Sequence, residues 1–201
     1  MIVALILAAG ESRRMGSPKA MLPFPTGEAT PGKVTFLDHL ISVVQRPRVE
    51  MVRVVLGANA ETIRQRVRLQ EEWVVINKDW RKGQLSSIQA GLRALPEGSD
   101  GILLCPVDTP LISAPIVDQL VQRFYESGKG IVLPVHKEKR GHPVIFAARL
   151  YPALLAAPEN KGARAVVWEH SADVLEVVTE DEGVVLNLNE PDALTRHLGS
   201  A

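Results

Sequence analysis

The sequence predicts a single α/β domain in which helices cover both faces of a mostly parallel β-sheet. A continuous apolar run at residues 2–7 shows no alternation of polarity, which is typical of a strand buried on both faces of a parallel sheet. Later runs repeat this pattern, and segments of helical length separate them. The length of 201 residues suits one domain with a sizeable core.

The first part of the chain alternates strands with helices in a regular order. Strands are expected at residues 2–7, 52–56, 73–76, 101–104 and 130–133. Helices are expected at residues 35–45, 61–70, 86–95 and 114–126. In the first helix, Phe36, Leu40 and Val44 recur at the spacing of one helical face. Ser113 is expected to cap the last helix, with Pro115 in its first turn.

A looser pattern follows Gly141. Strands are expected at residues 144–146, 174–178 and 184–188, and helices at residues 150–156 and 163–169. Because the last two strands follow each other closely, they predict an antiparallel or mixed part of the sheet. No internal repeat, low-complexity tract or linker interrupts the sequence, so residues 1–201 are expected to form one domain.

Composition excludes several classes of protein. The 23 basic and 23 acidic side chains give a net charge of zero, which argues against a protein that coats nucleic acid. One cysteine, Cys105, excludes an intramolecular disulfide framework and a cysteine-based zinc cluster. The apolar run at residues 1–9 is well short of the roughly 20 residues that span a bilayer, and charged residues follow it directly. We therefore expect a cytoplasmic protein that binds no membrane.

The loop after the first strand, residues 7–19, combines small residues with positive charge. Gly10 and Gly16 allow the backbone to approach a ligand and expose its N–H groups to anionic oxygens. Arg14 and Lys19 add full charges that suit phosphate. A flexible loop with solvated basic residues is the alternative, but the position directly after a buried strand favours a phosphate site.

A second glycine-rich segment, residues 27–34, matches a phosphate-binding Walker A loop only up to Lys33. Val34 stands where a serine or threonine must bind magnesium, and Pro23 and Pro25 precede the segment where the motif requires a strand. We interpret this segment as a surface insertion ahead of a helix.

Asp108 follows the fourth strand on a short turn between Pro106 and Pro110. Carboxylates at strand ends are natural ligands for Mg²⁺, which prefers one or two of them together with substrate phosphates. The alternative is an aspartate that only stabilises its turn. The basic, glycine-rich loop nearby favours the metal site, and Cys105 is expected to pack beneath it as a small hydrophobic residue.

Five segments in this order resemble the nucleotidyltransferase family that attaches a nucleotide to the molybdenum cofactor, within the larger sugar-phosphate pyrophosphorylase-like superfamily. They are residues 7–19, 82–92, 105–110, 141–146 and 185–194. The resemblance implies a single-domain, Rossmann-like three-layer sandwich of the nucleotide-diphospho-sugar transferase type. It also implies a nucleotide-binding half at about residues 1–110 and an acceptor-side half at about residues 111–201.

The resemblance further implies a reaction in which a nucleoside monophosphate passes from an NTP to a phosphorylated acceptor, expected to be molybdopterin, with release of pyrophosphate. Arg14, Lys19 and Asp108 would be catalytic, and Mg²⁺ the cofactor. No protein general base is needed, since a phosphate monoester is already ionised. The implied nucleotide-binding residues are Leu7, Ala8, Ala9, Gly10, Arg14, Lys19, Gly83 and Ser87. The implied metal ligands are Asp108, Asn187 and Asn189, and His142 is the implied acceptor-side residue.

The signals for the base are mixed. Asn187 and Asn189 resemble the guanylyl-type members, whereas cytidylyl-type members carry aspartates there. Ala9 and the segments at residues 83–91 and 141–143 resemble the cytidylyl type. We therefore expect CTP to be favoured over GTP. Because an amide oxygen brings no charge, we also expect one tightly held metal ion.

Two other functions remain open. One is a transferase acting on a different phosphorylated small molecule, such as a sugar phosphate. The other is a non-catalytic nucleotide-binding accessory protein, against which the joint presence of Arg14, Lys19 and Asp108 argues. An acceptor molybdoenzyme or a chaperone is a further possible partner. The tryptophans, Trp73, Trp80 and Trp168, are expected in the core or in a lid and not as stacking platforms.

Overall fold

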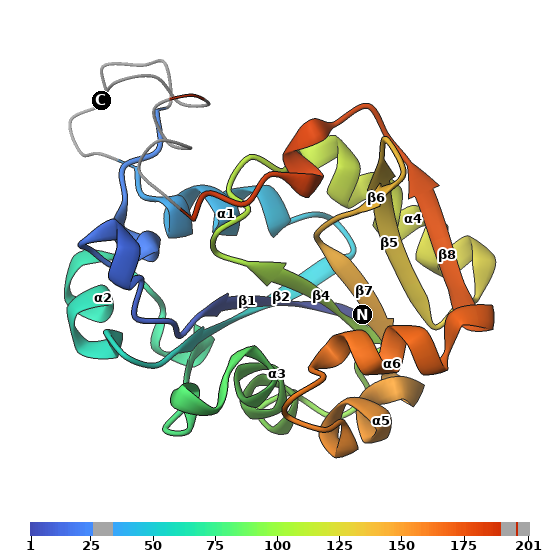
Figure 1. Cartoon of the computed structure of the whole chain (residues 1–201), viewed down its shortest axis with the longest axis horizontal. Coiled ribbons are helices and arrows are strands. Elements are labelled where there is room, and N and C mark those ends of the chain that lie inside the picture. The colour runs from blue at the N-terminus through green and yellow to red at the C-terminus, as the bar shows by residue number, and fades with distance from the viewer. Residues whose placement is uncertain (26–33, 190–195, 197–201) are drawn as a thin grey trace.

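The computed structural model describes residues 1–25, 34–189 and 196. The strands are β1 (Ile2–Ala8), β2 (Val49–Leu56), β3 (Val74–Ile76), β4 (Gly101–Pro106), β5 (Ile131–His136), β6 (Lys139–Arg140), β7 (Val144–Ala147) and β8 (Val174–Val178). The helices are α1 (Phe36–Val44), α2 (Ala60–Arg66), α3 (Gln84–Arg93), α4 (Ala114–Ser127), α5 (Tyr151–Ala156) and α6 (Ala163–Glu169). Helices α1 and α4 lie on one side of the sheet and α3, α5 and α6 on the other (Figure 1).

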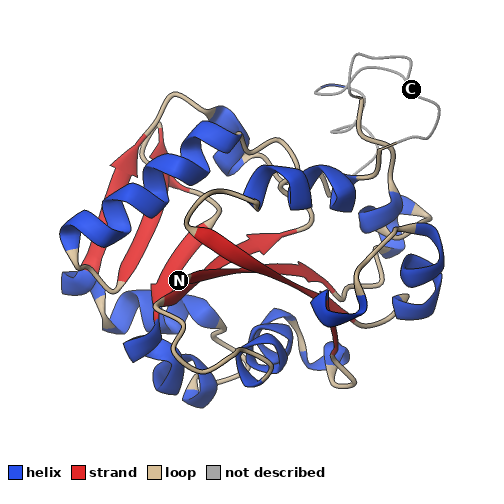
Figure 2. Cartoon of the chain, turned by 180° about the vertical axis from the view of Figure 1, so that it is seen from behind, coloured by secondary structure: helices blue, strands red, loops and turns tan. Residues whose placement is uncertain are grey.

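The sheet has the strand order β3-β2-β1-β4-β7-β5-β6, and β8 pairs with β5. Strands β1 to β4 run parallel, whereas β7 is antiparallel to both of its neighbours, β4 and β5. Strand β8 is parallel to β5. This arrangement confirms the α/β fold with a mostly parallel sheet and a smaller mixed part, seen from behind in Figure 2.

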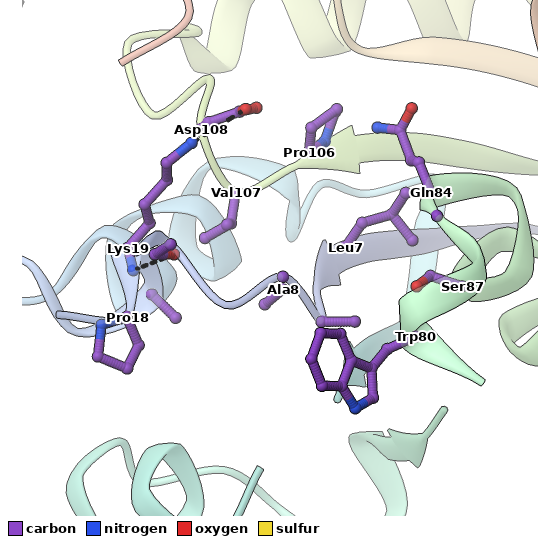
Figure 3. A pocket seen from close by; sticks show the side chains of 15 residues that line it. Leu7, Ala8, Pro18, Lys19, Trp80, Gln84, Ser87, Pro106, Val107 and Asp108 are labelled. Carbon is purple, nitrogen blue, oxygen red and sulfur yellow. Dashed lines mark hydrogen bonds and ion pairs between the residues drawn. The ribbon is translucent and has the colours of Figure 1, made fainter. Parts of the chain in front are cut away.

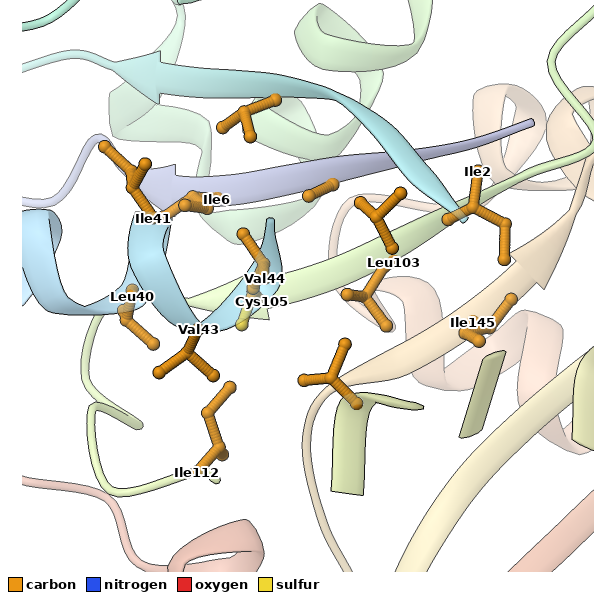
Figure 4. Packing of buried hydrophobic residues seen from close by; sticks show 14 of the residues in the cluster. Ile2, Ile6, Leu40, Ile41, Val43, Val44, Leu103, Cys105, Ile112 and Ile145 are labelled. Carbon is orange, nitrogen blue, oxygen red and sulfur yellow. The ribbon is translucent and has the colours of Figure 1, made fainter. Parts of the chain in front are cut away.

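Alternation along β1 divides the core between the two faces of the sheet. Ile2 and Ile6 pack with residues of α1 and α4 on one face, and Leu5 and Leu7 pack with α3 on the other (Figure 4 shows the first face). Full burial of such a side chain stabilises the fold by roughly 1.5–3 kcal/mol. The two packed faces hold β1 in place, and so fix where the loop that follows it begins.

Helix α1 begins at a capping box. The Thr35 side chain accepts a hydrogen bond from the Asp38 backbone N–H, and the Asp38 carboxylate accepts one from the Thr35 backbone N–H. Such a cap contributes about 1 kcal/mol. None of the helices among the described residues is long and apolar enough to cross a membrane.

Two sequence expectations for local structure were wrong. Helix α2 ends at Arg66 and not at residue 70, because Val67 adopts extended backbone and is buried. Residues 182–185 form a 3-10 turn in place of a strand: the Asp181 side chain accepts a hydrogen bond from the Gly183 N–H, and the Val184 carbonyl accepts one from His142 and not from a neighbouring strand. The mixed part of the sheet is present as expected, but β6 and β7 supply its antiparallel pairs, and β8 is parallel to β5.

Candidate functional site

The loops that follow β1 and β4 begin side by side. The two strands are parallel and in register from Ile2 opposite Gly101 to Leu7 opposite Pro106. The Val107 N–H donates a hydrogen bond of 3.0 Å to the Leu7 carbonyl just beyond the last pair. Neighbouring parallel strands deliver their following loops to one edge of the sheet, where ligands bind in open α/β folds. Asp108 and the glycine-rich loop therefore share one site.

A cleft of about 260 Å³ lies at this edge. Most of the nucleotide-binding residues implied by the sequence line it: Leu7, Ala8, Ala9, Gly10, Lys19, Gly83 and Ser87, together with Asp108. Figure 3 shows Lys19 and Asp108 at one end and Trp80 and Ser87 at the other. Arg14 lines a neighbouring hollow that it shares with Lys19 and Asn189. Trp80 and Gln84 also line this cleft, although neither was among the nucleotide-binding residues expected from the sequence. Gln84 lies within the segment at residues 82–92.

Lys19 contacts residues from two distant parts of the chain at this site. Its Nζ donates to Asp108 Oδ2 over 3.4 Å and to Asn189 Oδ1 over 2.5 Å. The Lys19 side chain is only 13% exposed, so solvent screens these contacts less than it would at a surface pair. The segment that carries Asn189 is held by its backbone, since the Leu188 N–H donates to the Asp108 carbonyl at 2.7 Å.

The oxygens beside Lys19 are suitable donors for a hard divalent cation. Asp108 offers a carboxylate and Asn189 an amide oxygen, and Mg²⁺ prefers such oxygens together with substrate phosphates. The Asn187 side chain is exposed, and no described contact brings it to this cluster. Within residues 1–25 and 34–189, no group of three or more His, Cys, Asp or Glu side chains gathers. A metal ion here would therefore depend on oxygens of the substrate.

The turn before α3 is fixed by a buried amide. The Asn77 side chain, 4% exposed, donates to Ser86 Oγ and Ser87 Oγ at 2.9 and 3.0 Å, and its oxygen accepts from the Asp79 N–H. Gly83 has φ +100°, a conformation that favours glycine, directly before the helix begins. These contacts hold Ser87 and the preceding turn against the cleft.

Gly57, directly after β2, has no side chain, which leaves room for Ala9 and Trp80 to lie against its backbone. A Cβ at this position would lie 2.6 Å from the Ala9 carbonyl oxygen and 2.7 Å from Trp80 Cβ. Real Cβ atoms do not approach this closely, so a side chain at Gly57 would displace the backbone of Ala9. The absence of a side chain at Gly57 therefore allows Ala9 and Trp80, which both line the cleft, to lie close to this position.

A second, wider cleft of about 540 Å³ adjoins the first, and Gln84 lines both. His142 lines the second cleft, as the sequence implied for the acceptor side. Burial lowers the pKa of its imidazole, while the nearby charge of Asp108 acts in the opposite direction. Its Nδ1 is buried and has no hydrogen-bond partner in the described part of the chain. Most buried polar atoms are paired, so this nitrogen is an exception.

Other residues singled out in the sequence fall in different places. Cys105 is fully buried, and burial together with the Asp108 charge raises the pKa of its thiol to about 12. Trp73 packs against the core as expected, but Trp168 is 59% exposed and lines the second cleft. The Walker-like segment at residues 27–33 and the end of the last motif at residues 190–194 lie outside the described residues.

Comparison with known proteins supports a common family. The family model described as MobA-like NTP transferase domain matches residues 4–174. A probable molybdenum cofactor guanylyltransferase of Mycolicibacterium paratuberculosis is 32% identical over 200 residues, covering 94% of this chain and 90% of that protein. Nicotine blue oxidoreductase of Paenarthrobacter nicotinovorans is 29% identical over 191 residues, covering 90% of each.

Solved structures show the same fold. The crystal structure of Rv0371c from Mycobacterium tuberculosis H37Rv has a TM-score of 0.84 at 25% identity, covering 99% of this chain and 97% of that one. A crystal structure of Rv0371c in complex with manganese has a TM-score of 0.77 at 21% identity, covering 100% and 99%. A divalent metal thus accompanies this fold in a solved protein.

Proposed function

We infer the function of this chain from a premise that its sequence supplies: it belongs to the MobA-like NTP transferase domain family, and it is a nucleotidyltransferase of that family. We propose that it moves a nucleoside monophosphate from an NTP to the phosphate of molybdopterin and releases pyrophosphate. The observation that carries this proposal is the cluster of Lys19, Asp108 and Asn189, where the first cleft adjoins the hollow that Arg14 lines. Residues 1–110 would serve the nucleotide, and residues 111–201 would serve mainly the acceptor.

The first cleft would hold the nucleotide. Leu7, Ala8, Ala9, Gly10, Gly83 and Ser87 would surround the base and ribose. Arg14 and Lys19 would hold the triphosphate and stabilise the negative charge that grows on the departing pyrophosphate. Lys19 is suited to this role because Asp108 and Asn189 already hold its ammonium where this cleft adjoins the hollow that Arg14 lines.

Asp108 would hold Mg²⁺, with Asn189 as an amide ligand; Asn187, the other ligand implied by the sequence, would have to turn inward. When bound, the ion supplies Lewis-acid polarisation of the nucleotide phosphates. The donor set of one carboxylate and one amide oxygen fits that ion together with substrate oxygens.

The acceptor phosphate would attack the α-phosphorus without help from a protein base. An oxygen of the phosphate monoester, already ionised at neutral pH, forms the new bond to phosphorus, and the bond to pyrophosphate breaks. Catalysis then depends on positioning and on charge neutralisation. His142 lines the second cleft and, with its pKa lowered by burial, would stand beside the acceptor as a neutral imidazole.

The preference for CTP is the finer part of the proposal. Ala9 and Trp80 line the same cleft and both lie beside Gly57, so their side chains would narrow the space for a base. Discrimination by pocket size is worth roughly 10- to 200-fold. Several relatives are named guanylyltransferases, so competition between CTP and GTP decides the point. Equal or tighter binding of GTP would overturn this preference and leave the transferase intact.

Pyrophosphate release tests the reaction itself. The four NTPs should each be incubated with Mg²⁺ and either molybdopterin or a panel of sugar phosphates. We expect release with molybdopterin and CTP. Release only with a sugar phosphate would support the alternative acceptor. No release with any pair would favour a nucleotide-binding accessory protein, or a redox activity such as the name of one relative carries.

A further inference from the structure

The chain between β8 and Asn189 begins with a 3-10 turn at Glu182–Val185, and Asp181 directly precedes this turn. One carboxylate oxygen of Asp181, Oδ1, accepts a hydrogen bond of 2.9 Å from the Gly183 N–H. The other oxygen, Oδ2, accepts from the Ser113 N–H at 3.2 Å and from the Ser113 Oγ at 2.6 Å. Asp181 therefore binds both its own turn and the start of α4, a segment that is 68 residues away in the chain (Figure 1).

The Ser113 hydroxyl serves this contact and not the helix that follows it. Ser113 directly precedes α4, where a serine ordinarily accepts a hydrogen bond from the helix backbone. Here no N–H of the described helix donates to its side chain, and Oγ donates to Asp181. Hydrogen bonds to an ionised carboxylate are stronger than those between neutral groups. Asp181 is thereby attached to residues 108–113, which we call the Asp108 loop.

Two glycines allow the turn to lie against its neighbours. A Cβ at Gly183 would collide with the Leu111 carbonyl, which belongs to the Asp108 loop. A Cβ at Gly141 would collide with the Val184 carbonyl, which accepts a hydrogen bond of 2.8 Å from the His142 N–H. The turn is therefore packed between the loop that carries the candidate metal ligand and a residue that lines the second cleft.

The same segment carries the amide oxygen of the candidate metal site. The N–H of Leu188, a residue that is 1% exposed, donates to the Asp108 carbonyl at 2.7 Å, and Asn189 Oδ1 accepts from Lys19 Nζ. The contacts at Asp181, at the glycine of the turn and at Leu188 thus follow the Asp108 loop in reverse order. Residues 181–188 therefore lie along this loop, and the Asp181 carboxylate fixes the end that is farther from the metal site.

A second aspartate plays a comparable part at the opposite end of β8. Asp173 directly precedes this strand, accepts a hydrogen bond of 2.9 Å from the Gly130 N–H and pairs with Arg149 at 2.9 Å. Gly130 precedes β5, so this contact lies at the amino ends of the two parallel strands, whereas the site lies beyond carboxyl ends. Neither Asp173 nor its partners line the two clefts. Asp173 is therefore a matched control for Asp181.

We propose that Asp181 is a positioning residue for nucleotidyl transfer. It lines neither cleft and acts through the segment that it holds. Its carboxylate keeps residues 182–189 along the Asp108 loop, so that the Asn189 oxygen stays beside Lys19 when the nucleotide and the metal ion bind. The metal role of Asn189 in this proposal rests on the proposed function. Without the carboxylate, the buried apolar side chains of the segment should preserve the fold, and the Asn189 oxygen should be held less firmly.

Hydrogen exchange of the full chain, followed by NMR, tests whether Asp181 holds the segment. In Asp181→Ala the Leu188 amide should exchange about tenfold faster, because a hydrogen bond to a charged group can change an opening equilibrium by that factor. Asp173→Ala should accelerate exchange at Gly130 and leave Leu188 unchanged. Ser113→Ala removes only the hydroxyl donor and should accelerate Leu188 about threefold, so it tests the same claim if Asp181→Ala does not fold. Unchanged exchange at Leu188 in the folded variants would overturn the proposal.

Titration of CTP and GTP, with Mn²⁺ and in EDTA, tests the consequence for the site. The wild type should bind its nucleotide more tightly with Mn²⁺ than in EDTA. Asp181→Ala should lose about tenfold of this enhancement, as expected when a metal ligand is oriented less well, and should keep the Kd measured in EDTA. Asp173→Ala should keep both.

The outcomes separate this inference from the proposed function. An enhancement that Asp181→Ala retains, or an equal loss of affinity in EDTA, would overturn the positioning role and leave the proposed function standing. If the wild type itself shows no enhancement by Mn²⁺, the metal site of the proposed function is removed, and the positioning role with it.

Discussion

The two clefts are lined by different kinds of chemical groups. The nucleotide cleft is formed largely by backbone and small side chains at the ends of buried parallel strands, with Gly57 allowing the closest contact. The acceptor cleft is lined by long side chains from the β6–β7 corner, the loop before α6 and α6 itself. The first leaves little freedom for substitution, whereas the side chains of α6 and of the loop before it can be exchanged without disturbing the sheet. In the proposed function, this contrast would separate the part that carries the chemistry from the part that selects the acceptor.

The largest expected effect comes from the end of the nucleotide cleft that holds Lys19 and Asp108. Asp108→Ala should reduce transfer to below a few per cent of wild type, since Asp108 supplies the carboxylate beside Lys19 that would bind Mg²⁺. Steady-state pyrophosphate release at saturating Mg²⁺ measures this. Asp118→Ala, which removes an exposed carboxylate paired with Arg46, is the control and should keep its activity. Turnover above a few per cent in Asp108→Ala would remove Asp108 from the metal role.

A substitution beside the nucleotide cleft should weaken nucleotide binding and leave binding in the acceptor cleft unchanged. Gly57→Ala places a Cβ 2.6 Å from the Ala9 carbonyl oxygen, so it should destabilise the fold by about 1–3 kcal/mol and weaken NTP binding. Gly10→Ala, which meets nothing within 4 Å, should unfold at the wild-type denaturant concentration. Chemical denaturation and NTP titration provide the measurements. A matching loss of affinity for molybdopterin in Gly57→Ala would contradict the separation of the two clefts.

The smallest effect concerns Cys105, at the end of β4 beneath the Asp108 turn. Its thiol pKa of about 12, raised by burial and by the Asp108 charge, keeps it protonated far above neutral pH. Alkylation needs the thiolate, so the folded protein should resist iodoacetamide at pH 8 and react after unfolding. Mass spectrometry reports the label. Labelling of the folded chain at the rate of a free thiol would show that this end of the sheet opens readily.

The same contrast explains which parts of the fold and of the site could be predicted from the sequence. Residues 2–8 and the loop after them were predictable, because a buried parallel strand has a continuous apolar pattern and its ligand loop follows it directly. The expected strand at residues 184–188 has the same apolar pattern. It is a turn instead, because Val184 bonds to His142, a partner far away in the chain.

The acceptor cleft could not be predicted in this way. Lys161, Arg164 and Trp168 lie on a short helix and the loop before it, without a motif. They line a cleft together with residues of β4, β5 and β7, and only the tertiary structure brings these segments together. The expectation that Trp168 would be a core or lid residue was wrong for the core, since most of its surface is exposed.

Lys19→Ala provides the most direct test of the central claim that the cluster of Lys19, Asp108 and Asn189 carries nucleotidyl transfer. If Lys19 stabilises charge on the leaving pyrophosphate, its removal acts mainly on the transition state. Turnover should then fall about a hundredfold or more, while the Kd for the NTP changes far less. Parallel measurement of kcat and the Kd of CTP decides between the possibilities. Equal losses in both would mean that Lys19 only binds the ground state, and would contradict the mechanism.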